Sequence, residues 1–323
     1  MKTAFSPLAA LFAFAALLGL SGAPAASAAP AAAAPINVAS YNLRYNNPGD
    51  GPNAWPARKE MVKSLIRYHE FDILGTQEGL SDQIAELAKM DEFDHVGIGR
   101  DDGKNAGEHS AIFYRKSRFT LLNKGDFWLS ETPDRPSLGW DATCCNRIAS
   151  WAHLRERDSG RTLYVFSVHF DHEGKQARRA SADLMLKKIA EIARGEPAIC
   201  VGDFNSTPDT AQIQAMSKAL RDARTASKAP PYGPSGTYNG FKLDAPMADR
   251  IDYIFVDRHF DVLKYATLSD SLGGRYPSDH HPVVARVTLK EANSAVSSRH
   301  RPPGPLGGAI IASDVTMARS VTR

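Results

Sequence analysis

The hydrophobic and polar positions between residues 36 and 290 follow two periods, one typical of strands and one of helices. Residues 36–41 alternate apolar and polar side chains, as a half-buried strand does. Residues 175–194 instead place apolar side chains such as Met185 and Ile189 on one helical face. These patterns predict helices at 57–69, 81–89, 175–194 and 210–220, and strands at 36–41, 71–75, 110–114, 119–129, 146–154, 162–169, 197–201, 250–256, 260–267 and 282–289.

Few helices are predicted among many strands, and several strands, such as 250–256 and 260–267, follow one another directly. A parallel doubly wound sheet would need a crossover between successive strands, so the order of elements excludes it. We therefore predict an α/β fold in which two mixed sheets pack together with helices outside. Residues 36–290 are long enough for one large domain with a substantial core, and they contain no internal repeat.

The two ends of the chain differ in composition from this body. Lys2 precedes an almost wholly apolar run that is too short to span a bilayer comfortably, and Ala26-Ser27-Ala28 offers a small-residue cleavage site. We expect an exported protein, periplasmic or extracellular, without a stable membrane anchor. The expected segments are a signal peptide at 1–28, an Ala/Pro linker at 29–35 and a disordered tail at 291–323.

The charge of the body is balanced. Of the net charge of +3, Lys2 contributes one, and four arginines against two acidic residues beyond residue 290 contribute two. The body is therefore neutral, unlike proteins that grip long nucleic acid through many phosphates. Short oligonucleotides and small phosphate esters remain open as substrates.

The three cysteines are Cys144, Cys145 and Cys200, and they form no Cys-x-x-Cys pair of the kind found in cysteine-rich metal sites. Adjacent cysteines rarely pair with each other, because a disulfide needs a particular separation of the two residues. We therefore expect any bridge from Cys144 or Cys145 to lead elsewhere. Cys200, inside an apolar strand, is expected to pack as a small hydrophobe.

Three polar clusters stand at the ends of apolar runs: Gly202-Asp203-Phe204-Asn205, Arg250-Ile251-Asp252-Tyr253 and Ser278-Asp279-His280-His281-Pro282. Side chains fixed at strand ends can aim rigid chemistry into a cleft. A single cluster of this kind has the ordinary composition of a turn. Three of them, with similar positions upstream, indicate a functional site.

Candidate oxygen ligands for a metal ion come from three strand ends, two of which lie upstream of these clusters. Asn42 ends the first strand, Glu78 follows the second, and Asp279 precedes the last. Two carboxylates and an amide suit Mg²⁺ or Mn²⁺, whereas zinc prefers His and Cys. The run from His169 to His172 is similar to half of a dinuclear zinc motif, but its first ligand position is Ser167, so we disfavour zinc.

Further candidates could move protons. A carboxylate beside an imidazole fixes its tautomer, and such pairs can stabilise charge on a phosphoryl group. Asp203 with Asn205 could hold and deprotonate a water, and His281 is expected to point away from His280 along its strand. The predicted catalytic residues are Glu108, His169, Asp203, Asn205, Asp252 and His280.

Arginines and long loops supply candidates for substrate binding. Arg44, Arg58 and Arg147 could grip a phosphate, with surface salt bridges as the alternative. Asp171 and His172 either line the cleft or cap the following helix. The long polar loops at 46–56, 130–147 and 227–245 contain aromatic residues that either set specificity or pin the loops to the body.

The order Asn42, Glu78, His169, Asp203-x-Asn205, Asp252 and Ser278-Asp279-His280 resembles the endonuclease/exonuclease/phosphatase superfamily over residues 35–290. The resemblance implies a four-layer α/β sandwich, with two mixed β-sheets flanked by helices and the site at one edge of the sheets. Segments such as Tyr41-Asn42-Leu43-Arg44-Tyr45 and Val168-His169-Phe170-Asp171-His172 resemble a bacterial, often exported, subgroup.

The same resemblance implies a role for each motif residue. Asn42 and Glu78 would hold the Mg²⁺ (or Mn²⁺), with Asp279 close by. Asp203 and Asn205 would position and activate the attacking water. His169 would contact the phosphate and be oriented by Glu108, and His280 would pair with Asp252.

We therefore expect a metal-dependent phosphoesterase, foremost an exported nuclease on RNA or DNA. The alternative is a phosphomonoesterase for small esters or phospholipid and inositol headgroups. Asp252 is followed by Tyr253, where inositol 5-phosphatases have Arg, and no sphingomyelinase-like hairpin is visible, so the lipid readings are less favoured. A non-catalytic binding module is disfavoured because no catalytic position is substituted. We expect a monomer whose partner is its phosphate-ester substrate, nucleic acid included.

Overall fold

Two six-stranded sheets form the centre of the molecule, in a computed structural model that describes Met1 and residues 34–290. The first sheet has the order β11-β12-β1-β2-β4-β3, and the second has the order β5-β6-β7-β8-β10-β9. The strands of the first sheet are β1 (Ile36–Asn42), β2 (Ile73–Gln77), β3 (Phe93–Val96), β4 (Ile112–Arg115), β11 (Phe260–Thr267) and β12 (Val283–Leu289). Those of the second are β5 (Phe119–Trp128), β6 (Ile148–Glu156), β7 (Thr162–His169), β8 (Ala198–Asp203), β9 (Arg221–Asp222) and β10 (Asp252–Val256).

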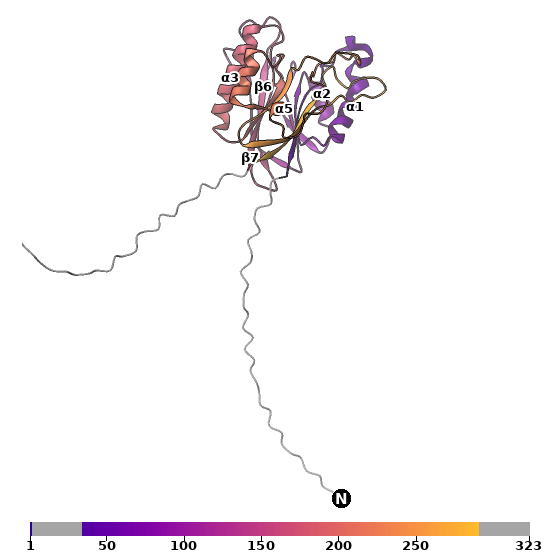
Figure 1. Ribbon diagram of the computed structural model, residues 1–323, viewed down its shortest axis with the longest axis vertical. Helices are drawn as coiled ribbons and strands as arrows, with labels where there is room; N and C mark the ends of the chain where they lie inside the picture. Colours follow the sequence, from indigo (N-terminus) through magenta and orange to yellow (C-terminus); the bar gives the residue numbers. More distant parts are fainter. Residues whose placement is uncertain (2–33, 291–323) are drawn as a thin grey trace, which may run out of the picture. The chain divides into compact units, whose positions relative to one another are not determined.

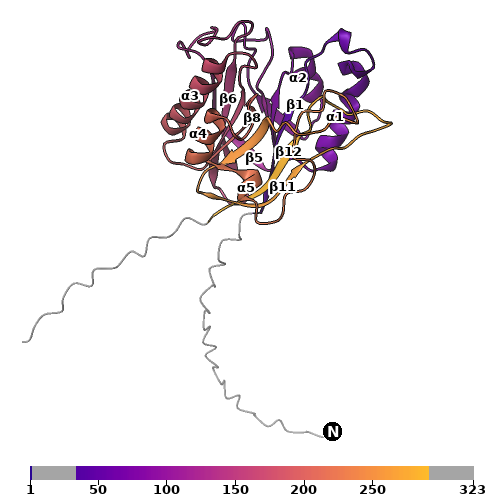
Figure 2. The same ribbon diagram turned by 45° about the horizontal axis from the view of Figure 1, so that its top comes forward.

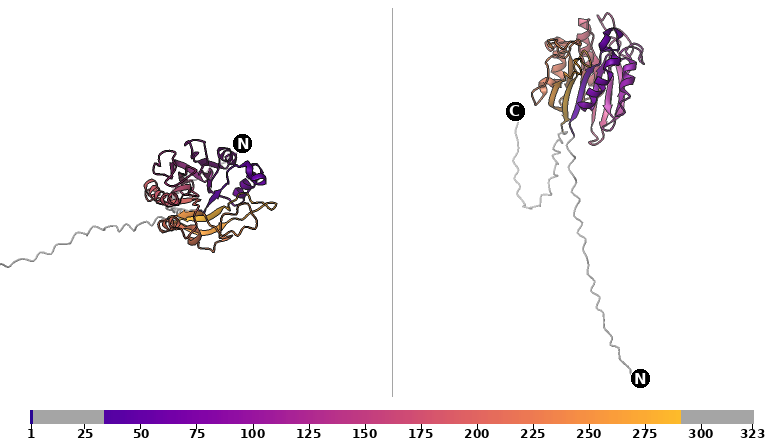
Figure 3. Two further views of the ribbon diagram at one scale, coloured as in Figure 1. Left: turned by 90° about the horizontal axis from the view of Figure 1, so that it is seen from above. Right: turned by 90° about the vertical axis from the view of Figure 1, so that its right-hand side faces the viewer.

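Helices cover both outer faces (Figures 1 and 2). They are η1 (Pro48–Asn53), α1 (Trp55–Tyr68), α2 (Ser81–Leu87), α3 (Lys175–Ala193), α4 (Ala211–Ala219) and α5 (Ala223–Ala226). In Figure 2, α3 and α4 lie on one side of the strands and α1 and α2 on the other. The views from above and from the side show the same layering (Figure 3).

Three buried clusters account for this four-layer arrangement. The central cluster joins the facing sides of the two sheets, with Val38 and Ile73 from the first and Val201 from the second. A second cluster packs Met185 of α3 against the other face of the second sheet. A third packs Ile66 of α1 against the first sheet. The four-layer α/β sandwich is therefore confirmed.

Strand β7 shows how the sequence produces these layers. Leu163 and Val165 belong to the central cluster, whereas Phe166 and Val168 face the α3 side. Because both faces of the strand are buried over most of its length, apolar side chains occur on both faces and not on one alone. His169, the last residue of the strand, is polar and lies where the chain leaves the apolar core.

The predicted strands β7 and β11 have the bounds that the structure shows, whereas several short elements were missed. Strand β3 is a half-exposed four-residue edge strand, and the two residues of β9 are too few to show a period. The second strand was predicted at 71–75, two residues too early, since β2 begins at Ile73 and ends at Gln77. The expected leader at 1–28 and tail at 291–323 lie outside the described residues. Within the part that is described, no helix has the length and apolarity to cross a membrane.

The strand register brings the polar strand ends to one edge of the sandwich. Strands β7 and β8 are parallel, with His169 paired to Asp203. The antiparallel β10 pairs Asp252 with the same Asp203. In the first sheet, the parallel β1 and β2 end together at Asn42 and Gln77, while antiparallel β12 begins beside them. Polar side chains from distant positions in the sequence therefore lie close together at this edge.

The two sheets approach each other closely at Gly75, and substitution of this residue tests their packing. A Cβ atom at this position would collide with Val201 and would lie 2.9 Å from Ser167 Oγ. We expect Gly75→Ala to lower the free energy of unfolding by about 1–3 kcal/mol through overpacking. Urea denaturation would measure the loss.

The control is a double-mutant cycle with Val201→Ala, which removes the methyl group that collides. The double variant should lose less stability than the sum of the two single losses. Additive losses, or a Gly75→Ala protein as stable as wild type, would contradict the close approach of β2 and β8.

Candidate active site

Asp203 lies at the centre of the polar edge. Asn42 Nδ2, from the other sheet, donates a hydrogen bond of 3.0 Å to its Oδ2. The Nε2 atoms of His169 and His280 lie 3.5 and 3.8 Å from the same oxygen, and the backbone N of Asn205 donates to Oδ1 at 2.9 Å. Burial, and then the nearby charge of Asp252, raise the pKa of Asp203. The carboxylate is thus tightly held and more basic than an exposed aspartate.

His280 is paired with a second buried carboxylate. Its Nδ1 lies 2.8 Å from Asp252 Oδ2, and the Asp252 backbone N donates to Thr237 Oγ1 at 3.1 Å. Burial alone would lower the pKa of His280, but the pairing with Asp252 outweighs it and holds the pKa well above its usual value. The pairing therefore favours the protonated imidazole, whose Nε2 lies 3.8 Å from Asp203 Oδ2.

His169 is in the opposite protonation state. The Asn205 side-chain amide donates both to Phe170 O, at 3.0 Å, and to His169 Nε2, at 3.1 Å. That nitrogen must therefore be unprotonated, and the ring proton is on Nδ1, 3.7 Å from Glu108 Oε2. Burial, and then the charge of Arg147, lower the pKa of His169 to about 3, so the ring is neutral.

Glu108 also contacts Arg100, a residue that no sequence pattern singles out. Arg100 Nη1 contacts Glu108 Oε2 at 2.6 Å, closer than the His169 ring does. The Arg100 backbone N also donates to Glu108 O at 3.0 Å, so a folded-back loop places the two side by side. A lone arginine eight positions before Glu108 has no periodic signal, and only this loop geometry reveals it.

The predicted metal ligands lie together beside Asp203. Asn42 Nδ2 donates to Glu78 Oε1 at 2.9 Å, and Tyr45 N donates to Glu78 Oε2 at 3.1 Å. Burial, and among further causes the charge of Glu78, raise the pKa of Asp279 to about 6. The partly buried Glu78 carboxylate, the buried Asp279 carboxylate and the Asn42 amide oxygen, which accepts from Arg44 N at 2.9 Å, are oxygen donors of the kind that fits a hard divalent cation.

The backbone near these ligands is strained. Glu78 has a φ of +62° and Arg44 a φ of +54°, both in the left-handed region that non-glycine residues rarely adopt. Glu78 comes directly after β2, and Arg44 comes two residues after the end of β1. Strain of this kind persists where the surrounding structure over-determines it, and it gathers at functional sites.

Two of the three predicted phosphate-binding arginines line the cleft. Arg44 makes two bonds of 2.9 Å to Asp50, and its Nε lies 3.9 Å from Asp279 Oδ2. Arg147 is buried, with its Nε 3.3 Å from Asp171 Oδ2. Each guanidinium is thus held in place by a carboxylate while it remains part of the cleft wall.

The prediction that Arg58 binds a phosphate in the cleft is wrong. Its side chain is buried in α1 and donates to the carbonyls of Asn53, Leu43, Arg44 and Pro277. The guanidinium is therefore committed to backbone acceptors and does not line the cleft. Its role in the structure is to tie the loop after β1 to the segment before Asp279.

Of Asp171 and His172, only His172 fills one of the roles considered for them. Asp171 Oδ1 accepts from Glu173 N at 2.9 Å and Gly174 N at 2.6 Å, in the turn before α3, so it does not cap the helix, and its Oδ2 faces Arg147. His172 lines the cleft, with Arg147 Nη2 2.6 Å from its Nδ1. His281, as expected, points away, against Tyr276 and Met247.

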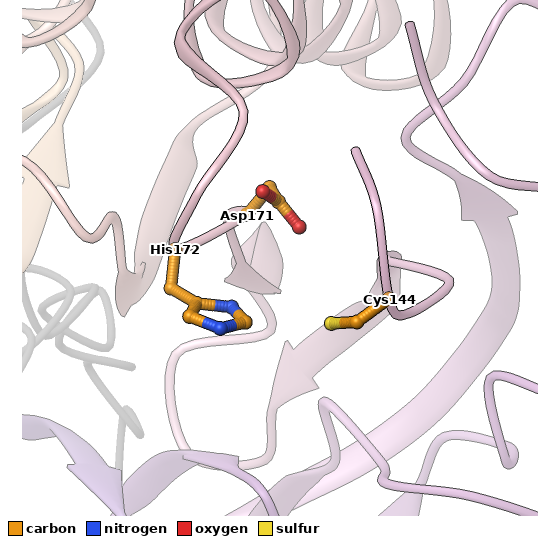
Figure 4. Close-up of side chains that lie close together, drawn as sticks. All are labelled: Cys144, Asp171 and His172. Carbon is orange, nitrogen blue, oxygen red and sulfur yellow. The ribbon is translucent and has the colours of Figure 1, made fainter. Parts of the chain in front are cut away.

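Cys144 and Cys145 form a disulfide with each other, so the expectation that any bridge would lead elsewhere was wrong. The third cysteine, Cys200, is buried inside β8, as expected, and offers them no partner. Cys144 lies near Asp171 and His172 (Figure 4), with one potential ligand atom of each residue within 4.8 Å of the others. Its sulfur is committed to the disulfide, so this trio is not a ready metal site.

These residues enclose a cleft of about 600 Å³. Its floor is the polar edge described above, and its rim comes from the loops after β1 and β5 and before β10. The lining residues are Arg44, Tyr45, Glu78, Arg100, Glu108, Cys144, Cys145, Arg147, His169, His172, Asp203, Asn205, Tyr238, Ile251, Asp279 and His280.

The fold and the site together define a hydrolase that acts on phosphate esters. The chain belongs to the Endonuclease/Exonuclease/phosphatase family, whose model matches residues 39–280. The family is typically dependent on a divalent metal ion, in keeping with the oxygen ligands at the floor of the cleft.

A mannosyl-6-phosphatase from Bacteroides thetaiotaomicron is 42% identical, with a TM-score of 0.76, and the match covers 79% of this chain and 100% of that one. The human Nocturnin catalytic domain, at 21% identity and a TM-score of 0.62, shares the fold over 80% of this chain and 94% of that one. The Ccr4 exoribonuclease subunit of Mycosarcoma maydis is 22% identical over 81% of this chain and 52% of its own length. The chain spans between 36% and 59% of the length of the curated relatives it matches.

The corrected role of Arg58 predicts a loss of stability. Arg58→Lys cannot reach all four carbonyls and leaves buried acceptors without donors, so we expect the free energy of unfolding to fall by about 3 kcal/mol. Arg44→Lys, on a partly exposed side chain, is the matched control and should cost less than about 1 kcal/mol. Chemical denaturation compares the two. Equal stability of both variants would show that Arg58 does not hold the loop after β1 to the segment before Asp279.

Proposed function

We propose that this protein is an exported phosphomonoesterase that hydrolyses small phosphate esters of the sugar-phosphate type. The observation that carries the proposal is the composition of the cleft: arginines held by carboxylates surround a small volume beside the residues that would hold a divalent metal ion. The likeness to a mannosyl-6-phosphatase at 42% identity over that protein's whole length supports it. The apolar leader with its small-residue cleavage site supports export.

The charge of the cleft suits a phosphate dianion once a divalent cation is present. Among the lining residues three arginines face four carboxylates, and the charge of His280 is offset by its partner Asp252, so an excess of negative charge remains until a cation binds. A bound Mg²⁺ or Mn²⁺ would add two positive charges, which would offset this excess and attract the phosphate of a phosphomonoester. The cleft is also of a size that takes a small molecule.

Asn42, Glu78 and Asp279 would hold the metal ion, Mg²⁺ (or Mn²⁺). When bound, it would act as a Lewis acid on a phosphate oxygen and neutralise developing charge. Arg44 and Arg147 would bind the other phosphate oxygens, since guanidinium groups match phosphate geometry.

Asp203 is better placed than His280 to accept the proton of the attacking water. His280 already carries a proton, because Asp252 stabilises the charged ring, so it can donate but cannot accept. Asp203 has a raised pKa and is fixed by Asn42 and Asn205. Its role is to take the proton of the water. The Nε2–H of His280 would then stabilise negative charge on the phosphoryl group.

A nuclease is the second candidate. Tyr238 lies at the cleft with 45% of its surface exposed, and an exposed aromatic ring can stack on a nucleobase. The likeness to Ccr4 exoribonucleases points the same way, although at 22% identity. The neutral body argues against a grip on long nucleic acid, so short oligonucleotides would be the expected substrates.

A substrate panel separates the two candidates. We expect the purified protein with Mg²⁺ to release phosphate from mannose 6-phosphate and p-nitrophenyl phosphate. Turnover of bis-p-nitrophenyl phosphate, single-stranded RNA and plasmid DNA should be much slower. EDTA should abolish the activity and added Mg²⁺ or Mn²⁺ should restore it.

Faster turnover of the diester or of RNA than of any monoester would favour the nuclease. Activity that survives EDTA would overturn the metal assignment for Asn42, Glu78 and Asp279.

Two substitutions test the proton-transfer residues. Asp203→Asn and His280→Gln should each lower kcat by about 10²–10⁴-fold, the usual contribution of a positioned acid or base. Because Asp203 is buried beside Asp252, removing its charge should leave the fold at least as stable, which thermal unfolding would check. Near wild-type turnover of either variant on the best substrate would disprove its role.

A further inference from the structure

The Cys144–Cys145 disulfide is held firmly at the rim of the cleft. It lies on the long loop between β5 and β6, where Asp141 accepts hydrogen bonds from Gln176 N at 3.0 Å and Ala177 N at 2.7 Å of α3. Thr143, which directly precedes the two cysteines in the sequence, donates a hydrogen bond from its Oγ1 to Glu173 Oε2. The rim is therefore ordered before any ligand arrives, which reduces the entropy that binding must overcome.

The disulfide presents a surface of unusual chemistry for this site. Cys144 is exposed and both cysteines line the cleft. Sulfur atoms joined to each other have no proton to donate, and they are polarisable, so they favour contact with C–H groups over contact with phosphate. Arg147, two residues after Cys145, carries the positive charge of the same wall. The wall thus changes from cationic to apolar along a short stretch of chain.

His172 adds a directional donor next to this surface. Figure 4 shows the Cys144 side chain extending toward the His172 ring. Because the Arg147 guanidinium can only donate, the His172 Nδ1 that lies 2.6 Å from it must be the acceptor. The ring proton is therefore on Nε2. That atom is 3.6 Å from Glu173 Oε1, longer than a hydrogen bond, so it can donate to a ligand hydroxyl.

We infer that the Cys144–Cys145 disulfide and His172 form the subsite for the alcohol part of the substrate, and that they select a polyhydroxylated ring such as a hexose. The disulfide contacts the C–H face of the ring, and His172 Nε2–H donates to one of its hydroxyls. A hexose phosphate offers both features on one molecule, together with a phosphate for Arg147. The inference rests on the proposed phosphomonoesterase activity and specifies which monoesters it prefers.

The test compares kcat/KM for mannose 6-phosphate and glucose 6-phosphate with kcat/KM for methyl phosphate, which has no ring. In the Cys144→Ser/Cys145→Ser double variant, and separately in His172→Ala, the hexose-to-methyl ratio should fall by about tenfold, mainly through KM for the hexose phosphate. Leu138→Ser, which changes an exposed side chain on the same loop outside the cleft, is the control and should keep the wild-type ratio.

Reduction of the wild-type protein supplies a measurement that does not depend on folding of the double variant. Treatment with a phosphine reductant, followed by thiol counting, should lower the ratio as the serine substitutions do. An unchanged ratio after substitution and after reduction would overturn the subsite while leaving the phosphomonoesterase proposal intact. Equal losses on hexose and methyl phosphate would also overturn it, since they would show a general effect on the site. A wild-type protein that hydrolyses only diesters would overturn both proposals.

Discussion

The hydrogen bond from Asn42 Nδ2 to Asp203 Oδ2 joins the two sheets at the edge where their polar strand ends meet. Asn42 ends β1 of the first sheet, and Asp203 ends β8 of the second. The same amide also donates to Glu78, so one asparagine links the metal side of the cleft to the carboxylate that faces both histidines. The bond can form only because the central core holds the sheets face to face at a fixed separation, which Gly75 shows to be close. Packing of the core and alignment of the site are thus one constraint.

The two histidines near Asp203 differ in charge because their partners differ. His280 has a carboxylate at 2.8 Å that is itself buried, and the pairing keeps the ring protonated. His169 has its carboxylate at 3.7 Å, and that carboxylate is occupied by Arg100. Burial, and then the positive charge of Arg147, favour the neutral ring. A cationic donor and a neutral ring therefore occur in the same cleft because His280 has a close carboxylate partner that outweighs burial, whereas His169 does not.

The floor of the site could be predicted from the sequence far better than its rim. Asn42, Asp203 and His280 follow or precede strands, and parallel or antiparallel order then brings them together. Arg100 and the disulfide lie on long loops whose paths depend on contacts with no periodic signal. The misassignment of Arg58 has the same origin, since no local pattern reveals that carbonyls from the β1 loop and from Pro277 converge on it. Short edge elements such as β3 were missed because a half-exposed strand of four residues gives too few positions to define a period.

This division between floor and rim also separates chemistry from selection. Residues at strand ends are fixed by two sheets and two helical layers, so a change of substrate cannot easily move them. Loop residues are fixed by a few capping bonds, such as those of Asp141 to α3, and each loop can change without disturbing the core. A phosphate can therefore be recognised in the same way at the floor while different rims admit different alcohols. The proteins that this chain is similar to carry names as different as exoribonuclease and mannosyl-6-phosphatase, a spread that fits selection of the substrate at the rim.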